Sequence, residues 1–235
     1  MTDLPSVIVT RPEPGASDFA AALQSRIAGA QIVVSPVLEI VFHQHRGDLS
    51  GWALLLFTSA NAVRAVGPPR PGTRALCVGA ATTEAARAAG FDAAMGGEDA
   101  AGLLAAILQD PPSGPVLHLR GAHARGDIVG ALSRAGIAAE DRVVYDQQER
   151  PLSAEAIGTL SGPARCVLPV FSPRTALLLS RQMPVPVAPI DLIAISDAVR
   201  GAWQGPAPRR LIVADRPDMA AMLDATAAAC ADALP

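Results

Sequence analysis

The sequence predicts an α/β protein made of two similar domains, each built on a parallel sheet. Short apolar runs alternate along the chain with alanine- or leucine-rich stretches of helical length, which is typical of parallel strands covered by helices on both faces. In addition, the run ALLLFTSANAV at 53–63 has a counterpart in CVLPVFSPRTALLL at 166–179. In both runs an apolar strand ends at a hydroxyl-bearing turn and a helix follows.

The N-terminal part of the chain begins with a strand and a helix. Residues 7–10 (VIVT) form an apolar run that stops at Arg11, and FAAALQSRIAG then has a helical pattern that ends at Gly29. Residues 31–42 (QIVVSPVLEIVF) are extended and β-branched, and Pro36 argues against a central strand there.

The same order of elements returns later in the chain. Residues 116–119 run into Arg120-Gly121, and the helical stretch DIVGALSRAG is followed by the extended RVVYDQQE. Likewise, FTSANAV leads to ALCVGAATTEAARAAG, and VFSPRTALLL leads to LIAISDAVRGAW. Equivalent positions are about 110 residues apart, a spacing that is too long for a solenoid repeat and that suits a duplicated α/β domain. The matched pairs are Arg11 with Arg120, Ser59 with Ser172, and Gly79 with Ser196.

The composition indicates a globular protein with a substantial core. The chain has 235 residues, 50% of them hydrophobic, and a mean hydropathy of +0.31. No apolar stretch is long enough to cross a bilayer, and the N-terminus MTDLPSVIVT lacks the basic start of a signal peptide, so we expect a cytoplasmic protein. The three cysteines are too far apart to indicate a disulfide framework or a zinc site.

All 19 basic residues are arginine, and this excludes several kinds of chemistry. Without lysine there is no Walker-type phosphate lysine, no Schiff base and no pyridoxal-phosphate chemistry. The net charge of −3 and the lack of a basic stripe interleaved with aromatics disfavour nucleic-acid binding. The four histidines show no metal or triad spacing, and the acidic residues form no convincing catalytic pair.

Candidate binding residues lie where the expected strands end. Ligands of parallel α/β sheets bind at the carboxyl ends of the strands, and with two domains we expect the site in the cleft where those edges face each other. Free backbone N–H groups at helix starts bind carboxylates or phosphates, and the arginines suit planar anions, because a guanidinium group binds carboxylate bidentately. The expected substrate-binding residues are therefore Thr10, Arg11, Thr58, Ser59, Asn61, Gly79, Thr82, Arg120, Gly121, Arg125, Ser172 and Ser196.

Several residues keep a second role open. Ser59 and Ser172 also suit helix N-capping, which is compatible with anion binding. Thr82 suits either a cap or a hydrogen-bond donor to a ligand, and each arginine could be an ordinary surface residue. Tyr145, the only tyrosine, is either a strand aromatic or a phenolic donor at the cleft edge. His118 is expected to be an ordinary strand-face residue.

Several short motifs occur in a fixed order: VIVTRPEPG, SPVLEI, FTSANAV, VGAATTEAA, LRGAHARGD, VVYD, FSPRTA and AISDAV. Together they resemble the uroporphyrinogen-III synthase family of tetrapyrrole biosynthesis, and they cover nearly the whole chain. The resemblance implies cyclisation of hydroxymethylbilane, a linear tetrapyrrole rich in carboxylates, to uroporphyrinogen III with loss of water and inversion of ring D. It also implies no cofactor, no metal, no nucleic-acid or membrane partner, and a monomer. In such a reaction Tyr145 is the expected catalytic residue, a donor to the leaving hydroxyl.

The resemblance further implies a domain organisation that the sequence alone leaves open. The two domains would be flavodoxin-like, joined by two extended β linkers, with the cleft between them. Domain 1 would combine residues 1–37 with 152–235, domain 2 would comprise 48–144, and the linkers would be 38–47 and 145–151.

One motif departs from the family pattern. The family usually has a threonine in its last turn, in a pattern like IG-x-TTA, whereas this chain has Ile195-Ser196-Asp197 there. Either Ser196 supplies the hydroxyl or the contact is lost. The missing threonine is the main support for an alternative function, a non-catalytic two-lobed module that closes on a small anion. A flavodoxin-like FMN protein is a weaker alternative, because few aromatic residues could stack on a flavin.

Overall fold

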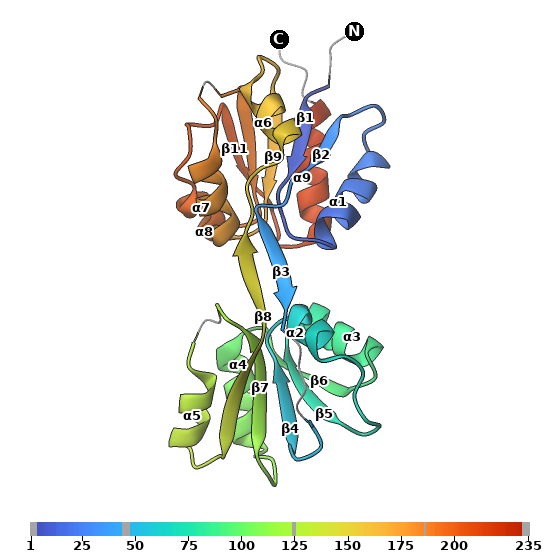
Figure 1. Cartoon of the computed structure of the whole chain (residues 1–235), viewed down its shortest axis with the longest axis vertical. Helices are drawn as coiled ribbons and strands as arrows, with labels where there is room; N and C mark the ends of the chain where they lie inside the picture. Colours follow the sequence, from blue (N-terminus) through green and yellow to red (C-terminus); the bar gives the residue numbers. More distant parts are fainter. Residues whose placement is uncertain (1–3, 44–47, 124–125, 186, 232–235) are drawn as a thin grey trace. The chain divides into compact units, whose positions relative to one another are not determined.

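The computed structural model describes residues 4–43, 48–123, 126–185 and 187–231. The chain divides into two compact units (Figure 1). Unit 1 comprises Met1–Glu39 and Gln148–Pro235, and unit 2 comprises Ile40–Gln147. The predicted fold class is confirmed, because each unit contains a sheet of predominantly parallel strands with helices on both faces.

Unit 1 is a five-stranded sheet in the order β11-β10-β9-β1-β2, and its paired strands are all parallel. Helices α1 and α9 pack on one face, and α6, α7 and α8 pack on the other. The strands are β1 (Ser6–Val9), β2 (Ile32–Val34), β9 (Cys166–Val170), β10 (Ile190–Ala194) and β11 (Arg210–Val213). The helices are α1 (Gly15–Gln24), α6 (Ala154–Ser161), α7 (Pro173–Gln182), α8 (Asp197–Ala202) and α9 (Met219–Ala231).

Unit 2 contains a six-stranded sheet in the order β3-β8-β7-β4-β5-β6, with parallel pairing from β8 to β6. Helices α2 and α3 cover one face, and α4 and α5 cover the other. The strands are β3 (Leu38–Phe42), β4 (Leu54–Phe57), β5 (Arg74–Val78), β6 (Asp92–Gly97), β7 (Val116–Gly121) and β8 (Ala139–Glu149). The helices are α2 (Ala60–Val66), α3 (Ala80–Ala88), α4 (Ala100–Gln109) and α5 (Ile128–Arg134).

The two units share one strand order once the chain break in unit 1 is taken into account. Counting unit 1 from β9 to β11 and then through β1 and β2, its sheet reads 3-2-1-4-5, and the parallel strands β4 to β8 of unit 2 read the same way. If the five strands of unit 1 are instead numbered 1 to 5 in chain order, the sheet reads 2-1-3-4-5 starting from β2. This is the flavodoxin-like order. The repeated motifs therefore occupy equivalent strands, and unit 2 is inserted between β2 and β9 of its counterpart.

Burial of both sheet faces explains why the central strands are continuous apolar runs. Every residue of β1, β4, β9 and β10 is buried. Strands of this kind alternate their side chains between two helix layers, so a polar residue on either face is costly unless it is paired. The strands therefore carry their polar chemistry at their ends, where the turns begin.

Asp191, in β10, is a buried exception to this rule, with no exposed surface. Its carboxylate accepts hydrogen bonds from Arg209 (Nε–Oδ1 2.8 Å, Nη2–Oδ2 2.6 Å) and from Arg165 (Nη1–Oδ2 2.8 Å). Arg165 also donates to the carbonyl of Ala229 at 2.9 Å. Burial alone would raise the pKa of Asp191, but these arginines hold it below its usual value. The cluster thereby connects α9 to the end of the unit 1 sheet where its strands begin.

Replacing Asp191 with alanine should lower the free energy of unfolding by about 3–5 kcal/mol, because the change leaves inward-facing guanidinium groups without their shared carboxylate. Urea denaturation would measure the loss. Asp224→Ala is the matched control, since Asp224 pairs with Arg26 and its side chain is 70% exposed. The control should cost less than about 1 kcal/mol. Equal losses in the two variants would contradict a structural role for the buried cluster.

Candidate active site

In each unit the carboxyl ends of two central strands flank the point where the strand order reverses. These strands are β9 and β1 in unit 1, and β4 and β7 in unit 2. Open α/β sheets bind ligands in the crevice at such a switch point. Residues expected from the sequence to bind substrate lie at or after the ends of these strands and of their neighbours β5 and β10, and Tyr145 lies in β8. We call the first set the unit 1 rim (Thr10, Arg11, Ser172, Ser196). The second set is the unit 2 rim (Thr58, Ser59, Asn61, Gly79, Thr82, Arg120, Gly121, Tyr145).

Arg11 is the only arginine of the unit 1 rim, and its guanidinium group is held in place from several sides. It lies over the ring of Phe171, 4.3 Å from the centroid, and its Nη1 lies 3.7 Å from Sδ of Met219. A Cβ at Gly15 would lie 2.8 Å from its Nε, so a larger residue there would push the guanidinium group from this position. Burial lowers the pKa of Arg11, and Asp18 partly offsets this. No carboxylate among the described residues forms an ion pair with Arg11.

The hydroxyl groups of the unit 1 rim differ in what they bind. The predicted N-cap at Ser172 is confirmed: its Oγ accepts from the backbone N–H of Thr175 at 3.0 Å and lies 2.8 Å from that residue's hydroxyl. Ser196 is the N-cap residue of α8, but its side chain makes no capping bond. Thr10 is fully buried, and its Oγ1 has no partner in the part of the chain that the structure describes. Ser196 and Thr10 thus keep hydroxyl capacity that Ser172 has already used.

The helix starts of the unit 2 rim are closed by local hydrogen bonds. The predicted N-cap at Ser59 is confirmed, because its Oγ accepts from the N–H of Asn61 at 3.2 Å. The Asn61 side chain in turn accepts from Arg64 at 3.1 Å. The N–H of Gly79 donates to the carbonyl of Gly97 at 2.8 Å, so a ligand would have to replace this hydrogen bond to bind the N–H.

Of the two roles that the sequence left open for Thr82, the helix cap is wrong. Gly79 is the N-cap of α3, and Thr82 lies inside the first turn, only 7% exposed. The neighbouring Thr83 hydroxyl donates to the Gly79 carbonyl at 2.8 Å. This carbonyl also accepts from the Thr83 N–H, so neither threonine side chain caps the N–H groups that begin α3.

Arg120 has a carboxylate partner within its own sheet. Its Nε donates to Asp141 on the adjacent strand β8, and its Nη1 donates to the carbonyl of Gly121 at 3.1 Å. Arg120 is thus neither an ordinary surface arginine nor an unpaired cation, unlike Arg11 at the equivalent strand end. Arg125, the other expected arginine, lies outside the described residues.

Tyr145 and Gly121 form a close contact at the end of the β7–β8 pairing. A shift in register between Arg120 and Gly121 places Gly121 opposite Tyr145. A Cβ at Gly121 would lie 2.5 Å from Cζ and 2.8 Å from the hydroxyl of the tyrosine, so the ring rests directly on the glycine. Tyr145 is 8% exposed, and its hydroxyl makes no hydrogen bond to another described residue. Tyr145 is therefore a core aromatic residue whose hydroxyl has no hydrogen-bond partner among the described residues.

His118 contacts a residue of the unit 2 rim, which was not expected from the sequence. It is 4% exposed, and its Nε2 lies 3.3 Å from the Thr58 hydroxyl. The pKa of His118 is lowered to about 4, mainly by burial and also by nearby Arg120, while Asp141 partly offsets these effects. The ring is thus neutral at neutral pH. The available signal was the spacing HLR, because alternate residues of a strand share a face and place His118 beside Arg120.

A small pocket of about 180 Å³ lies beside these side chains in unit 2. Its walls come from β7, β8 and the start of α5. The polar lining residues are His118, Arg120, Asp127 and Asp141.

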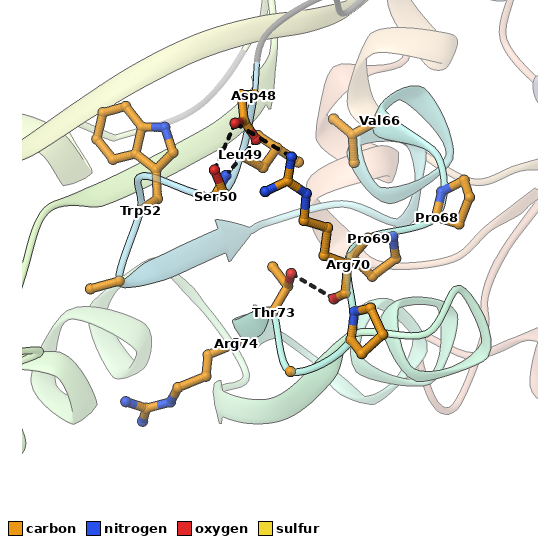
Figure 2. Close-up of a pocket in the computed structure, with 13 residues that line it drawn as sticks. Asp48, Leu49, Ser50, Trp52, Val66, Pro68, Pro69, Arg70, Thr73 and Arg74 are labelled. Carbon is orange, nitrogen blue, oxygen red and sulfur yellow. Dashed lines mark hydrogen bonds and ion pairs between the residues drawn. The ribbon is translucent and has the colours of Figure 1, made fainter.

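A second pocket in unit 2, of about 460 Å³, lies at the end of the sheet where strands β4 and β5 begin (Figure 2). Trp52 and Arg74, at the amino ends of β4 and β5, line it together with the proline-rich turn at 68–71. Arg70 lies 3.6 Å from Asp48 across the pocket. None of its lining residues was expected from the sequence to bind substrate.

The described residues hold neither a metal-binding cluster nor a membrane-spanning helix. They contain no group of three or more histidine, cysteine or acidic side chains that could hold a metal ion. None of their helices combines the length and apolar character that crossing a bilayer requires.

Comparisons with known proteins agree on one family. The family model described as uroporphyrinogen-III synthase HemD matches residues 17–224. The fold is similar to that of uroporphyrinogen-III synthetase from Helicobacter pylori 26695, with 18% identity, 96% of this chain and 99% of that chain covered, and a TM-score of 0.64. It is also similar to a mutant uroporphyrinogen III synthase from the extremely thermophilic bacterium Thermus thermophilus, with 15% identity, coverage of 94% and 96%, and a TM-score of 0.51. No curated protein sequence matches the chain.

Burial of neutral His118 should make stability depend on pH. Because the pKa is about 4 in the folded chain and 6.5 in the unfolded chain, only the unfolded chain takes up this proton between those values. The free energy of unfolding should therefore fall by about 2 kcal/mol through this residue between pH 7 and pH 5. Urea titrations of the wild type and His118→Gln at both pH values measure it. The variant should lose that part of the pH dependence; an equal fall in both proteins would contradict the assignment.

Proposed function

The chain belongs to the uroporphyrinogen-III synthase family, and we propose that its two rims bind the carboxylates of hydroxymethylbilane. The family's reaction closes this linear tetrapyrrole to uroporphyrinogen III, with loss of water and inversion of ring D. Pyrrole nitrogen lone pairs can expel the hydroxyl and leave a delocalised cation. The tasks left to the protein are to fold the substrate into a shape that can close and to assist the leaving oxygen.

Arg11 is the observation that carries the proposed binding mode. A guanidinium group is planar and binds carboxylates bidentately, and here Phe171 and Met219 already hold it at the end of β1. Since no described carboxylate forms an ion pair with it, a substrate carboxylate can supply the missing counter-charge. Stacking on Phe171 also limits the side-chain freedom that would be lost on binding.

Hydroxyl groups provide the second part of the proposed binding mode. Thr10 has an unpartnered buried hydroxyl among the described residues, and Ser196 does not use its side chain to cap α8. We propose that Ser196 stands in for the family's threonine. Thr58, Ser59 and the amides that begin α2 would act in the same way in unit 2. The full proposed substrate-binding set remains Thr10, Arg11, Thr58, Ser59, Asn61, Gly79, Thr82, Arg120, Gly121, Arg125, Ser172 and Ser196.

Tyr145 is the proposed catalytic residue. The leaving hydroxyl departs as water only after it gains a proton, and a phenol can donate that proton or a hydrogen bond. The ring of Tyr145 packs on Gly121, which sets the direction of its hydroxyl. No described residue forms a hydrogen bond with this hydroxyl. We propose that substrate is its hydrogen-bond acceptor.

The proposal also covers the setting of the enzyme. One chain carries both rims, which supports activity as a monomer. The three cysteines are all free and buried, as is common in a reducing compartment, and this supports a cytoplasmic location.

The test of the proposed function is the isomer formed from fresh hydroxymethylbilane. Spontaneous closure gives uroporphyrinogen I, so the purified chain should divert the product to isomer III, as chromatography of the oxidised porphyrins would show. Isomer I alone would support the non-catalytic binding module instead. The family match favours the enzyme.

Tyr145→Phe should lower kcat by about 10- to 100-fold while KM changes little, because the ring keeps its packing and only the donor is lost. Initial rates of isomer III formation would measure both constants. Gly121→Ala should lower kcat comparably, because its Cβ would displace the ring. Gly51→Ala is the control, since a Cβ there meets nothing within 4 Å. Unchanged rates for Tyr145→Phe would remove this residue from the mechanism.

A further inference from the structure

The Thr58 hydroxyl is the one polar group of the unit 2 rim, among the described residues, that touches a buried imidazole ring. Thr58 follows the last residue of β4 and is half-buried, whereas His118 lies within β7 and is almost fully buried. The 3.3 Å separation between Oγ1 and Nε2 joins the two strands at the switch point of the sheet. No other described residue contacts the Thr58 hydroxyl through a hydrogen bond that would fix its direction.

The direction of this hydrogen bond decides what the hydroxyl can do for a ligand. A carboxylate only accepts hydrogen bonds, so Thr58 can bind one only by donating its O–H. The threonine oxygen must then accept from its other neighbour, which requires the proton of His118 to be on Nε2. If Thr58 instead donated to Nε2, its lone pairs would face the carboxylate and repel it.

The surroundings of the ring allow the required tautomer. A single proton on the neutral ring can lie on either nitrogen, and the neighbours are Leu56 on β4, Arg120 on the same strand and Asp141 on β8. Arg120 and Asp141 pair with each other. The pocket of about 180 Å³ that His118 lines has room for water, which can donate to Nδ1 once the proton is on Nε2.

We propose that His118 is a positioning residue for substrate binding: its Nε2–H donates to Thr58 and turns the Thr58 O–H toward a carboxylate of the tetrapyrrole. The inference rests on the proposed function, because it specifies how one group of the unit 2 rim meets its ligand. His118 does not touch the substrate and acts only through Thr58.

A double-mutant cycle on isomer III formation tests this. His118→Leu and Thr58→Val should each raise KM by about 10-fold with kcat little changed, as expected for one hydrogen bond to a charged group. The double variant should have the KM of Thr58→Val alone, because the ring has no further effect once the hydroxyl is gone. His118→Gln, whose amide N–H₂ can reach the place of Nε2–H, should keep KM near that of the wild type.

Leu56→Ala provides the matched structural control. Leu56 is the register partner of His118 and is fully buried, so its loss disturbs the same face of the sheet without touching the hydrogen bond. Its effect on KM should multiply with that of Thr58→Val. Thermal unfolding of every variant sets an assay temperature at which all are folded, and His118→Met replaces His118→Leu in the cycle if the leucine variant does not fold.

The outcomes separate the two claims. The positioning role would be overturned if the effects of His118→Leu and Thr58→Val on KM multiplied, or if His118→Gln raised KM as much as His118→Leu. In either case, formation of isomer III by the wild type would leave the proposed function intact. Isomer I alone from the wild type would overturn both.

Discussion

Parallel pairing within each sheet is the constraint on which the rest of the structure depends. When the strands of a unit run in one direction, their carboxyl ends share one edge, and the helices that follow begin there. Hydroxyls, helix-start amides and arginines that are far apart in the sequence thus gather at one rim. The buried strands beneath them carry almost no polar side chains, since both faces are covered by helices. The chemistry of the molecule is therefore confined to the turns.

A site made this way suits a reaction that needs little acid–base strength. The rims contain hydroxyls, amides and arginines, and the one imidazole that the structure describes beside them in a strand is neutral because burial lowers its pKa. The departing hydroxyl of the substrate is expelled by the substrate's own electrons, so the protein mainly holds a flexible polyanion in a conformation that can close. Many modest contacts serve that purpose better than one strong base.

The sequence was sufficient where local chemistry decides the outcome. Ser59 and Ser172 could be predicted as N-caps because capping depends on a few consecutive residues, and the strands could be predicted because covered parallel strands are uniformly apolar. It was insufficient where register decides. That Arg120 is paired with Asp141, or that Arg11 lies over Phe171, depends on which strands are neighbours. The cap role considered for Thr82 is wrong because α3 begins at Gly79, which places Thr82 inside the first turn.

The two copies of the duplicated unit solve the same geometric problem with different chemistry. The residue before the capping serine is Phe171 in unit 1 and Thr58 in unit 2. Phe171 meets Arg11, which follows the neighbouring strand β1, and Thr58 meets His118, which lies within the neighbouring strand β7.

The register explains this difference. When Arg11 is aligned with Arg120, Val9 of unit 1 matches His118 of unit 2. The register partner of Val9 is Val34, and the register partner of His118 is Asp141. With no carboxylate at the position of Val34, Arg11 forms no ion pair with a described residue and packs on an aromatic ring, and the proposed binding mode assigns its charge to a ligand. In unit 2, Asp141 pairs with Arg120, and the hydroxyl of Thr58 becomes the group that can face a ligand. The matched positions of the two rims therefore differ in their side chains: the arginine of unit 1 packs on an aromatic ring, and the arginine of unit 2 pairs with a carboxylate.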